Sequence, residues 1–151
     1  MNTANPDSDY PNPAYAWYVV VILFLAYTLA YIDRQIIALL VEPIKHDLQI
    51  SDTEISLLQG FAFVIFYTIT GIPLGRLADR KNRRLIISAG IFLWSIMTAV
   101  CGLARNFSNL FLARIGVGIG EACLTPAAYS MIADLFPKPK RGVPISFYAM
   151  G

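Results

Sequence analysis

Two long hydrophobic runs without a charged residue constrain this chain more than any other feature. Ile55–Gly75 covers 21 positions and Leu85–Ala104 covers 20. Each run is long enough to cross a bilayer as a helix, because about 30 Å of hydrocarbon takes roughly 20 helical residues. The polar segment between them, Gly75–Arg84, holds five of the chain's 12 basic residues. The pattern therefore predicts two membrane-spanning helices joined by a short basic turn at the membrane surface.

Composition agrees with a membrane protein. The chain has 151 residues, of which 56% are hydrophobic and 15% charged, whereas about 25% charged residues is usual in soluble domains. The net charge of +2 is too small to indicate nucleic acid as a partner. Cys101 and Cys123 lie inside apolar runs and match no disulfide or metal-ligand pattern, so neither a metal nor a cofactor is expected.

We predict an all-α membrane protein with four complete helices and the start of a fifth. A polar tail is expected over residues 1–13, and because it lacks the Lys and Arg of a secretory signal, we expect the first apolar run to be a retained span. The predicted spans cover residues 15–41, 53–76, 85–103 and 110–135, with the fifth helix over 143–151. An outer loop is expected over 42–51. The capping box Ser51-Asp-Thr-Glu54 predicts where the second span begins, and Pro73 predicts a bend within it.

The distribution of basic residues predicts the orientation of these helices. Segments 75–84 and 136–142 hold eight basic residues, whereas the segments on the other side hold only Lys45 and Arg105. Basic residues concentrate in cytoplasmic loops. We therefore expect a multi-pass protein of a bacterial inner membrane or another cell membrane, with its N-terminus in the cytoplasm.

Four charged residues inside the predicted spans are the candidate functional site. Asp33 and Arg34 belong to the first span, and Arg114 and Glu121 to the fourth. An ionised side chain in hydrocarbon costs about 3 kcal/mol, so such residues normally face a partner or a water-filled cavity. Because Arg114 and Glu121 are seven apart they share a face, whereas adjacent Asp33 and Arg34 point about 100° apart.

From the estimated depths we expect Asp33 to pair with Arg114 and to leave Glu121 as a deeper carboxylate. A carboxyl under the opposed influences of burial and a nearby arginine can exchange its proton near neutral pH, which proton coupling requires. The simpler interpretation is a static ion pair that only fixes helix packing. Tyr27 and Tyr31 share a face with Arg34, and either line the path of an amphiphile or serve ordinary packing.

Glycines in the second and fourth spans predict close helix packing. Gly116, Gly118 and Gly120 do not form a dinucleotide-binding loop, because the third glycine of that motif would fall on Glu121. Small residues instead allow another helix to approach closely. Gly71, four residues before Gly75, is interpreted in the same way.

Together these motifs resemble those of the major facilitator superfamily. Gly75-Arg-Leu-Ala-Asp79-Arg80-Lys-Asn82-Arg83-Arg84 is similar to the signature loop between that superfamily's second and third helices. Arg114, Gly118 and Ala122 match its fourth-helix motif. Where the generic loop has glycine, this chain has Asn82. That form is similar to the spinster-like branch, as are YIDR at 31–34, GIGEA at 118–122 and ADLF at 133–136.

The resemblance implies a proton-coupled secondary transporter of lipid-like amphiphiles, such as lysophospholipids or sphingosine phosphate, that works by alternating access. It implies proton coupling at Asp33 and Glu121 and a site for the substrate headgroup at Arg34 and Arg114. The basic turn would latch the transporter on the cytoplasmic side through five residues: Gly75, Asp79, Arg80, Arg83 and Arg84.

The superfamily's twelve helices form two six-helix halves, so residues 14–151 are expected to be part of the N-terminal half. The partners expected are the amphiphile, protons, membrane lipids and a second half of the transporter. One alternative is an organic-anion:proton symporter of the same superfamily. Another is a structural or regulatory membrane protein that transports nothing. An enzyme is not expected, since no catalytic motif is present.

Overall fold

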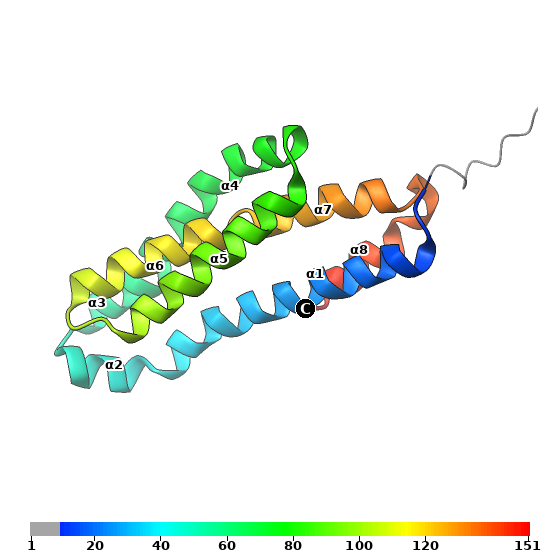
Figure 1. The fold of residues 1–151 in the computed structure, drawn as a ribbon. Helices are drawn as coiled ribbons and strands as arrows, with labels where there is room; N and C mark the ends of the chain where they lie inside the picture. Colours follow the sequence, from blue (N-terminus) through cyan, green and yellow to red (C-terminus); the bar gives the residue numbers. More distant parts are fainter. Residues whose placement is uncertain (1–9) are drawn as a thin grey trace, which may run out of the picture.

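The computed structural model describes residues 10–151 as an all-helical bundle, with no strand among those residues. The elements are α1 (Pro13–Leu39), α2 (Val41–Leu48), α3 (Asp52–Ser56), a π-helical turn (Leu57–Phe61), α4 (Ala62–Arg80), α5 (Arg83–Gly102), α6 (Phe107–Glu121), α7 (Leu124–Leu135), a 3-10 turn (Lys138–Lys140) and α8 (Gly142–Ala149). α6 packs between α4 and α5, and α8 packs along α1 (Figure 1).

Four helical stretches in the described part of the chain are long and apolar enough to cross a membrane. They are Pro13–Leu39, Asp52–Arg80, Arg83–Gly102 and Phe107–Leu135, with 20 to 29 residues each. The prediction of an all-α protein with four spans is confirmed. Of the predicted tail, residues 1–9 lie outside the described residues, and α1 begins at Pro13.

Capping residues mark where the helices begin. The predicted capping box is confirmed: the Ser51 hydroxyl accepts from the Glu54 N–H at 3.3 Å, and the Glu54 carboxylate accepts from the Ser51 N–H at 2.8 Å. Asn82, the residue that departs from the generic loop, caps α5 by accepting from the Arg84 N–H at 3.1 Å. Such a side chain satisfies one of the free N–H groups in the first helical turn.

The predicted outer loop over 42–51 is wrong, because most of it forms α2. Pro43 falls in the first turn of this helix, where its missing N–H has no intrahelical role. Glu42 in the first turn and Lys45 in the last turn both suit the helix dipole. Gln49, with φ of 53° in the left-handed region, ends the helix.

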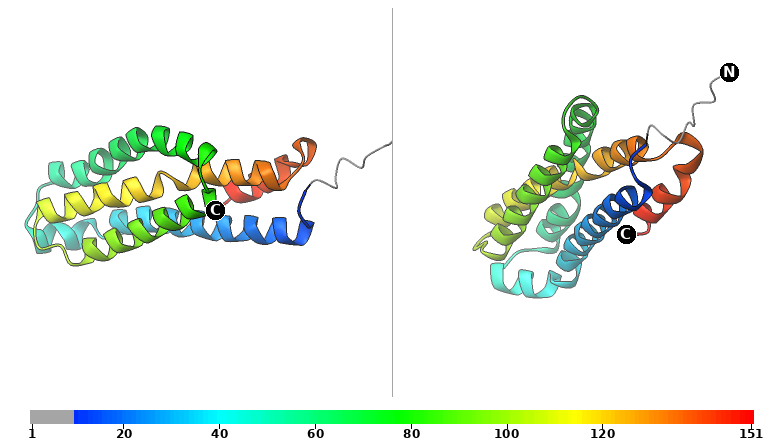
Figure 2. Two further views of the ribbon diagram at one scale, coloured as in Figure 1. Left: turned by 45° about the horizontal axis from the view of Figure 1, so that its top comes forward. Right: turned by 45° about the vertical axis from the view of Figure 1, so that its right-hand side comes forward.

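The predicted fourth helix is interrupted. α6 ends at Glu121 and α7 begins at Leu124, so Ala122 and Cys123 form a turn between them. Pro126 explains the interruption, because it lacks the N–H that would bond to the Ala122 carbonyl and its ring crowds that carbonyl. α4, which contains Pro73, follows a curved course (Figure 2).

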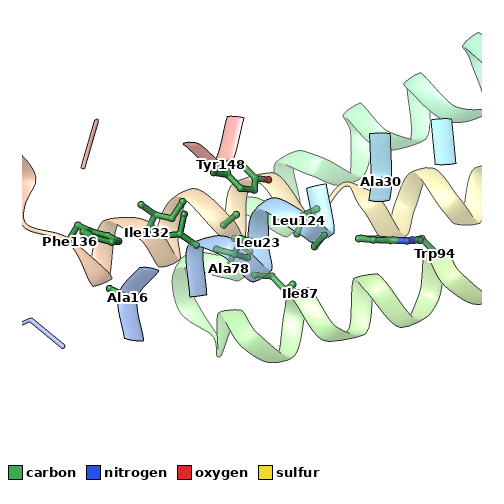
Figure 3. Close-up of a cluster of buried hydrophobic side chains, with 14 of the residues drawn as sticks. Ala16, Leu23, Ala30, Ala78, Ile87, Trp94, Leu124, Ile132, Phe136 and Tyr148 are labelled. Atoms are coloured by element: carbon green, nitrogen blue, oxygen red, sulfur yellow. The ribbon is translucent and has the colours of Figure 1, made fainter. Parts of the chain in front are cut away.

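The larger core cluster joins the two sides of the bundle where α1, α5, α7 and α8 meet (Figure 3). α1 contributes Ala16, Leu23 and Ala30, which are all buried. Tyr148 of α8 belongs to this cluster and packs against Tyr27, with ring centroids 5.0 Å apart and the ring planes tilted by 45°. Many large apolar side chains elsewhere on α1 are exposed, as suits a surface for lipid or for further helices.

Candidate functional site

The four intramembrane charges form two ion pairs between α1 and α6. Asp33 lies 3.8 Å from the Arg114 guanidinium (Oδ2 to Nη1), which confirms the predicted contact. Its carboxylate oxygens also accept from the Thr98 hydroxyl of α5 at 3.1 Å. Asp33 is thus held by one cation and one hydroxyl from two different helices.

The second pair corrects the expectation of a carboxylate without a partner. Arg34 Nε donates to Glu121 Oε2 at 2.6 Å, although the two residues are 87 positions apart in the sequence. Adjacent residues on a helix point about 100° apart, so Asp33 and Arg34 reach different partners. Each acid of the set therefore has an arginine on the facing helix.

Aromatic rings of α4 surround the arginines. The Arg34 guanidinium carbon lies 5.0 Å from the Phe63 ring centroid and 5.2 Å from that of Tyr67. The Arg114 guanidinium lies 5.3 Å from the same Phe63 ring. Cation–π attraction at such distances is worth about 0.5–2 kcal/mol, and it helps to hold each guanidinium in place.

The sequence interpretation missed Phe63, Tyr67 and Thr98. Phe63 and Tyr67 are four apart in the charge-free second span, a spacing that places both rings on one face of a helix. That spacing was the available signal for them. A lone Thr98 in an apolar helix carries no comparable signal.

Exposure differs among the four charged groups. The Arg34 side chain is 29% exposed, whereas that of Glu121 is fully buried and that of Arg114 is 4% exposed. Glu121 Oε1 and Arg114 Nε are buried without a hydrogen-bond partner among the described residues. The set thus combines one accessible cation, Arg34, with a buried acceptor on Glu121 and a buried donor on Arg114. A proton or a water can bind at the acceptor, and a water or a ligand can bind at the donor.

Glycines allow α6 to lie close enough for these contacts. A Cβ at Gly118 would lie 3.0 Å from the Phe63 carbonyl oxygen of α4, and one at Gly120 would lie 2.8 Å from the Trp94 nitrogen of α5. A Cβ at Gly116 would meet only the side chain of Met97 on α5, and Ala122 is buried. Gly71 differs: a Cβ there would meet no described atom within 4 Å, so its packing role stays a prediction.

The two tyrosines of α1 lie in different surroundings. Tyr27 packs on Tyr148, whereas Tyr31 is 52% exposed and its hydroxyl accepts from Gln35 Nε2 at 3.2 Å. Tyr31 is the more exposed of the two and Tyr27 packs between α1 and α8, while a role of either tyrosine in binding an amphiphile stays a prediction.

The basic turn between α4 and α5 is tied to α7. The Ser130 hydroxyl donates to Asp79 at 3.2 Å, and Arg83 forms an ion pair with Asp134. Arg84 Nη2 donates to the Tyr15 hydroxyl at 2.5 Å. Arg80 ends α4 on an exposed surface. Gly75 lies against α7, where a Cβ would be 3.5 Å from Pro126 Cβ.

Known proteins share both sequence and fold with this chain. The family model of the Major Facilitator Superfamily matches residues 23–151. A bacterial homolog of the human lysosomal transporter Spinster, solved in an inward-facing and unoccupied conformation, is 45% identical. Its structure matches with a TM-score of 0.89 over 93% of this chain and 29% of that one.

Two curated relatives carry different substrates in their names. The probable L-galactonate transporter of Escherichia coli is 38% identical over 129 residues, which cover 85% of this chain and 28% of that protein. The sphingosine-1-phosphate transporter SPNS2 of Xenopus tropicalis is 34% identical over 148 residues, which cover 93% and 29%.

The chain thus spans less than a third of the length of each of these proteins. Its apolar helices and its relatives make it an integral membrane protein. The predicted superfamily and the likeness to spinster proteins are confirmed. Because one family model matches the chain from residue 23 to residue 151, the protein belongs to the Major Facilitator Superfamily.

Proposed function

We propose that the intact protein is a proton-coupled transporter of a lipid-like amphiphile with an anionic headgroup, working by alternating access. The observation that carries this proposal is the double ion pair between α1 and α6, with two acids and two arginines in contact across two spans. Retained charges inside a membrane are functional by default, because their burial is costly. Likeness to spinster proteins supports the lipid-like substrate.

The double pair supports a simple coupling mechanism. Protonation of Glu121 removes its charge and weakens the bond from Arg34, which is the most exposed of the four charged groups. The freed guanidinium then binds the phosphate of the headgroup in a bidentate manner. Protonation of Asp33 likewise loosens Arg114, and the apolar tail follows the exposed face of α1 that includes Tyr31.

The latch and the orientation belong to the same proposal. The basic end of the bundle, formed by the α4–α5 turn and residues 136–141, lies in the cytoplasm and closes against the second half. The eight basic residues at this end support the assignment. Asp79, Arg80, Arg83 and Arg84 supply the charged contacts of that latch, and Gly75 supplies the close approach of α4 to α7.

The decisive experiment measures pH-driven uptake by the full-length protein in liposomes. Asp33→Asn and Glu121→Gln should each abolish the stimulation of lysophospholipid or sphingosine-phosphate uptake by a pH gradient. Glu42→Gln is the matched control, because Glu42 is an exposed acid on α2 away from the site. Uptake that kept its full pH dependence in both site variants would show that these carboxylates do not couple protons.

A second candidate substrate class is supported by the galactonate transporter. A sugar acid is an organic anion that two arginines can bind without any apolar tail. The same liposomes distinguish the classes: galactonate uptake in the absence of lysolipid or sphingosine-phosphate uptake favours the organic-anion:proton symporter.

A further inference from the structure

We infer that the pocket between α1, α2, α5 and α6 is a water-filled vestibule that gives Asp33 its own access to the solvent at the α2 end of the bundle. α2 lies at the same end as the turn between α5 and α6, opposite the basic end (Figure 1). The role of Asp33 in proton exchange rests on the proposed function, whereas the vestibule itself does not.

The pocket extends from a polar floor to the surface. Its volume is about 290 Å³, and its floor is formed by Asp33, Thr98 and Arg114. Asp47 of α2 also lines it, and the side chain of Asp47 is 78% exposed. One wall runs from Asp33 of α1 to Leu40, the residue that follows α1, and these seven steps along the chain span about 10 Å of helix axis. Asp33 is therefore separated from the surface by the pocket rather than by packed side chains.

The floor has the polar partners that water needs. A buried water usually makes two to four hydrogen bonds and takes about 30 Å³ of liquid volume, so the pocket has room for several. Arg114 lines the pocket, is 3% exposed, and its Nε has no hydrogen-bond partner among the described residues. Water is the natural partner for this donor, since an unsatisfied buried N–H costs about 1–3 kcal/mol. The walls above are mainly apolar and leave Asp33 and Arg114 as the anchors for the water.

The charges around the pocket favour entry of a proton. The groups that interact with the Asp33 carboxylate are Arg114 and Glu121 of α6 and the Thr98 hydroxyl and Cys101 thiol of α5, while Asp47 of α2 lines the same pocket nearer its mouth. Among the described lining residues Arg114 is the only cation, and it lies at the floor. The acidic Asp47 at the mouth raises the local concentration of cations. No basic residue of the described lining lies between the mouth and Asp33, so no positive charge there repels an entering proton.

The second carboxylate does not share this route. Glu121 is absent from the described residues that line the pocket, and its partner Arg34 is too. Protons from the α2 end therefore reach Asp33 within this helical unit, without entering the path that the substrate takes between the two halves. Proton and substrate have separate entrances on that side.

Thiol labelling of the full-length protein in sealed vesicles tests the vestibule. Cys101 lines the pocket, whereas Val100, next to it on α5 and at nearly the same depth, does not and is 39% exposed. Two variants compare them, each with any cysteine outside residues 1–151 of the full-length protein replaced by alanine: one carries Cys123→Ala, and the other carries Val100→Cys combined with Cys101→Ala and Cys123→Ala. A cationic, membrane-impermeant methanethiosulfonate added on the α2 side should label Cys101 at least about tenfold faster, because an ionised reagent reacts through water and is excluded from hydrocarbon.

The same labelling of the unaltered protein gives a result that does not depend on whether the variants fold. The same reagent should modify Cys101 and spare the buried Cys123, as mass spectrometry of the peptides will show. Equal labelling of the two reporters, or labelling of Cys101 from the basic end only, overturns the vestibule.

Failure of the vestibule and failure of the proposed function give different results. If Asp33→Asn abolishes pH-driven uptake but Cys101 is not labelled from the α2 side, the proton reaches Asp33 by another route and the inference is wrong. If Cys101 is labelled but Asp33→Asn keeps its full pH response, the vestibule stands, while the role of Asp33 in proton exchange is wrong together with the proposed function.

Discussion

At the scale of single residues, two glycine pairs with the same spacing differ in how closely a neighbouring helix packs against them. Gly116 and Gly120 are four apart, as are Gly71 and Gly75. A Cβ at Gly120 would lie 2.8 Å from the Trp94 nitrogen and 2.9 Å from the Gly90 carbonyl oxygen, both of them backbone atoms. At Gly71 no described atom lies within 4 Å of that position. Only the glycine that faces a neighbouring backbone is required by packing.

We therefore expect opposite effects from two identical substitutions in the full-length protein. Gly120→Ala should lower stability by about 1–3 kcal/mol, the usual cost of overpacking. Gly71→Ala should be neutral or stabilising, because alanine gains up to about 1 kcal/mol over glycine within a helix. Thermal unfolding in detergent measures both. If the two variants unfold at the same temperature, the close contact of α6 with α5 does not limit stability.

The charged site could be predicted only where a property of a single helix determines it. The sequence identified all four charged residues and the Asp33–Arg114 contact, because charges in apolar spans stand out and their depths follow from 1.5 Å per residue. The pairing of Arg34 with Glu121 was missed, since it depends on how α1 is rotated against α6. Rotation is set by the packing of many side chains, and no spacing within one helix specifies it.

At the scale of elements, the starts of helices could be predicted from the sequence better than the short helix between two spans. Capping residues correctly indicated where a helix begins at Ser51, since a cap is a local hydrogen bond. α2 was missed because half of its eight residues are charged or polar and because it contains Pro43. Its position is fixed by tertiary contacts: Lys45 forms an ion pair with Asp52 at the start of α3, at 2.5 Å.

This ion pair leads to a prediction for α2. The hydrogen bond to Asp52 raises the pKa of the Lys45 amine above its ordinary value. The amine therefore stays charged, and the link persists, throughout neutral and mildly alkaline pH; it is lost only as the pH rises through that raised pKa. Lys45→Met should make the amides of residues 41–48 exchange faster with deuterium at neutral pH.

The matched control for that experiment is His46→Ala. The His46 side chain is 86% exposed, and its hydrogen bond is to the adjacent Asp47 rather than to α3. Exchange over 41–48 should be unchanged in the control. Equal exchange in Lys45→Met and the unaltered protein would mean that apolar contacts of α2 alone hold it in place.

At the scale of the whole molecule, the basic turn joins three helices at one end of the bundle. Asp79 lies in the last turn of α4 and accepts a hydrogen bond from Ser130 of α7, while Arg83 begins α5 and forms an ion pair with Asp134 of α7. The turn is therefore held in position by contacts within the described residues. This supports the proposed latch, because charged groups that are already held in position lose less entropy on closing.

The contacts of Asp79 allow its two roles to be separated in the full-length transporter. Asp79→Asn keeps an oxygen that accepts from the Ser130 hydroxyl but loses the charge available to an arginine or a helix N-terminus of the second half. Ser130→Ala keeps the charge and removes the hydrogen bond. If the charge closes the latch, Asp79→Asn should shift the population towards the inward-open state, and Ser130→Ala should shift it much less.

Spin-label distances between Lys138→Cys and a cysteine on the facing turn of the second half will measure the shift as a gain of longer distances. Equal shifts in the two variants would instead assign Asp79 to the alignment of α4 with α7, and the latch would then depend on the arginines of the turn alone.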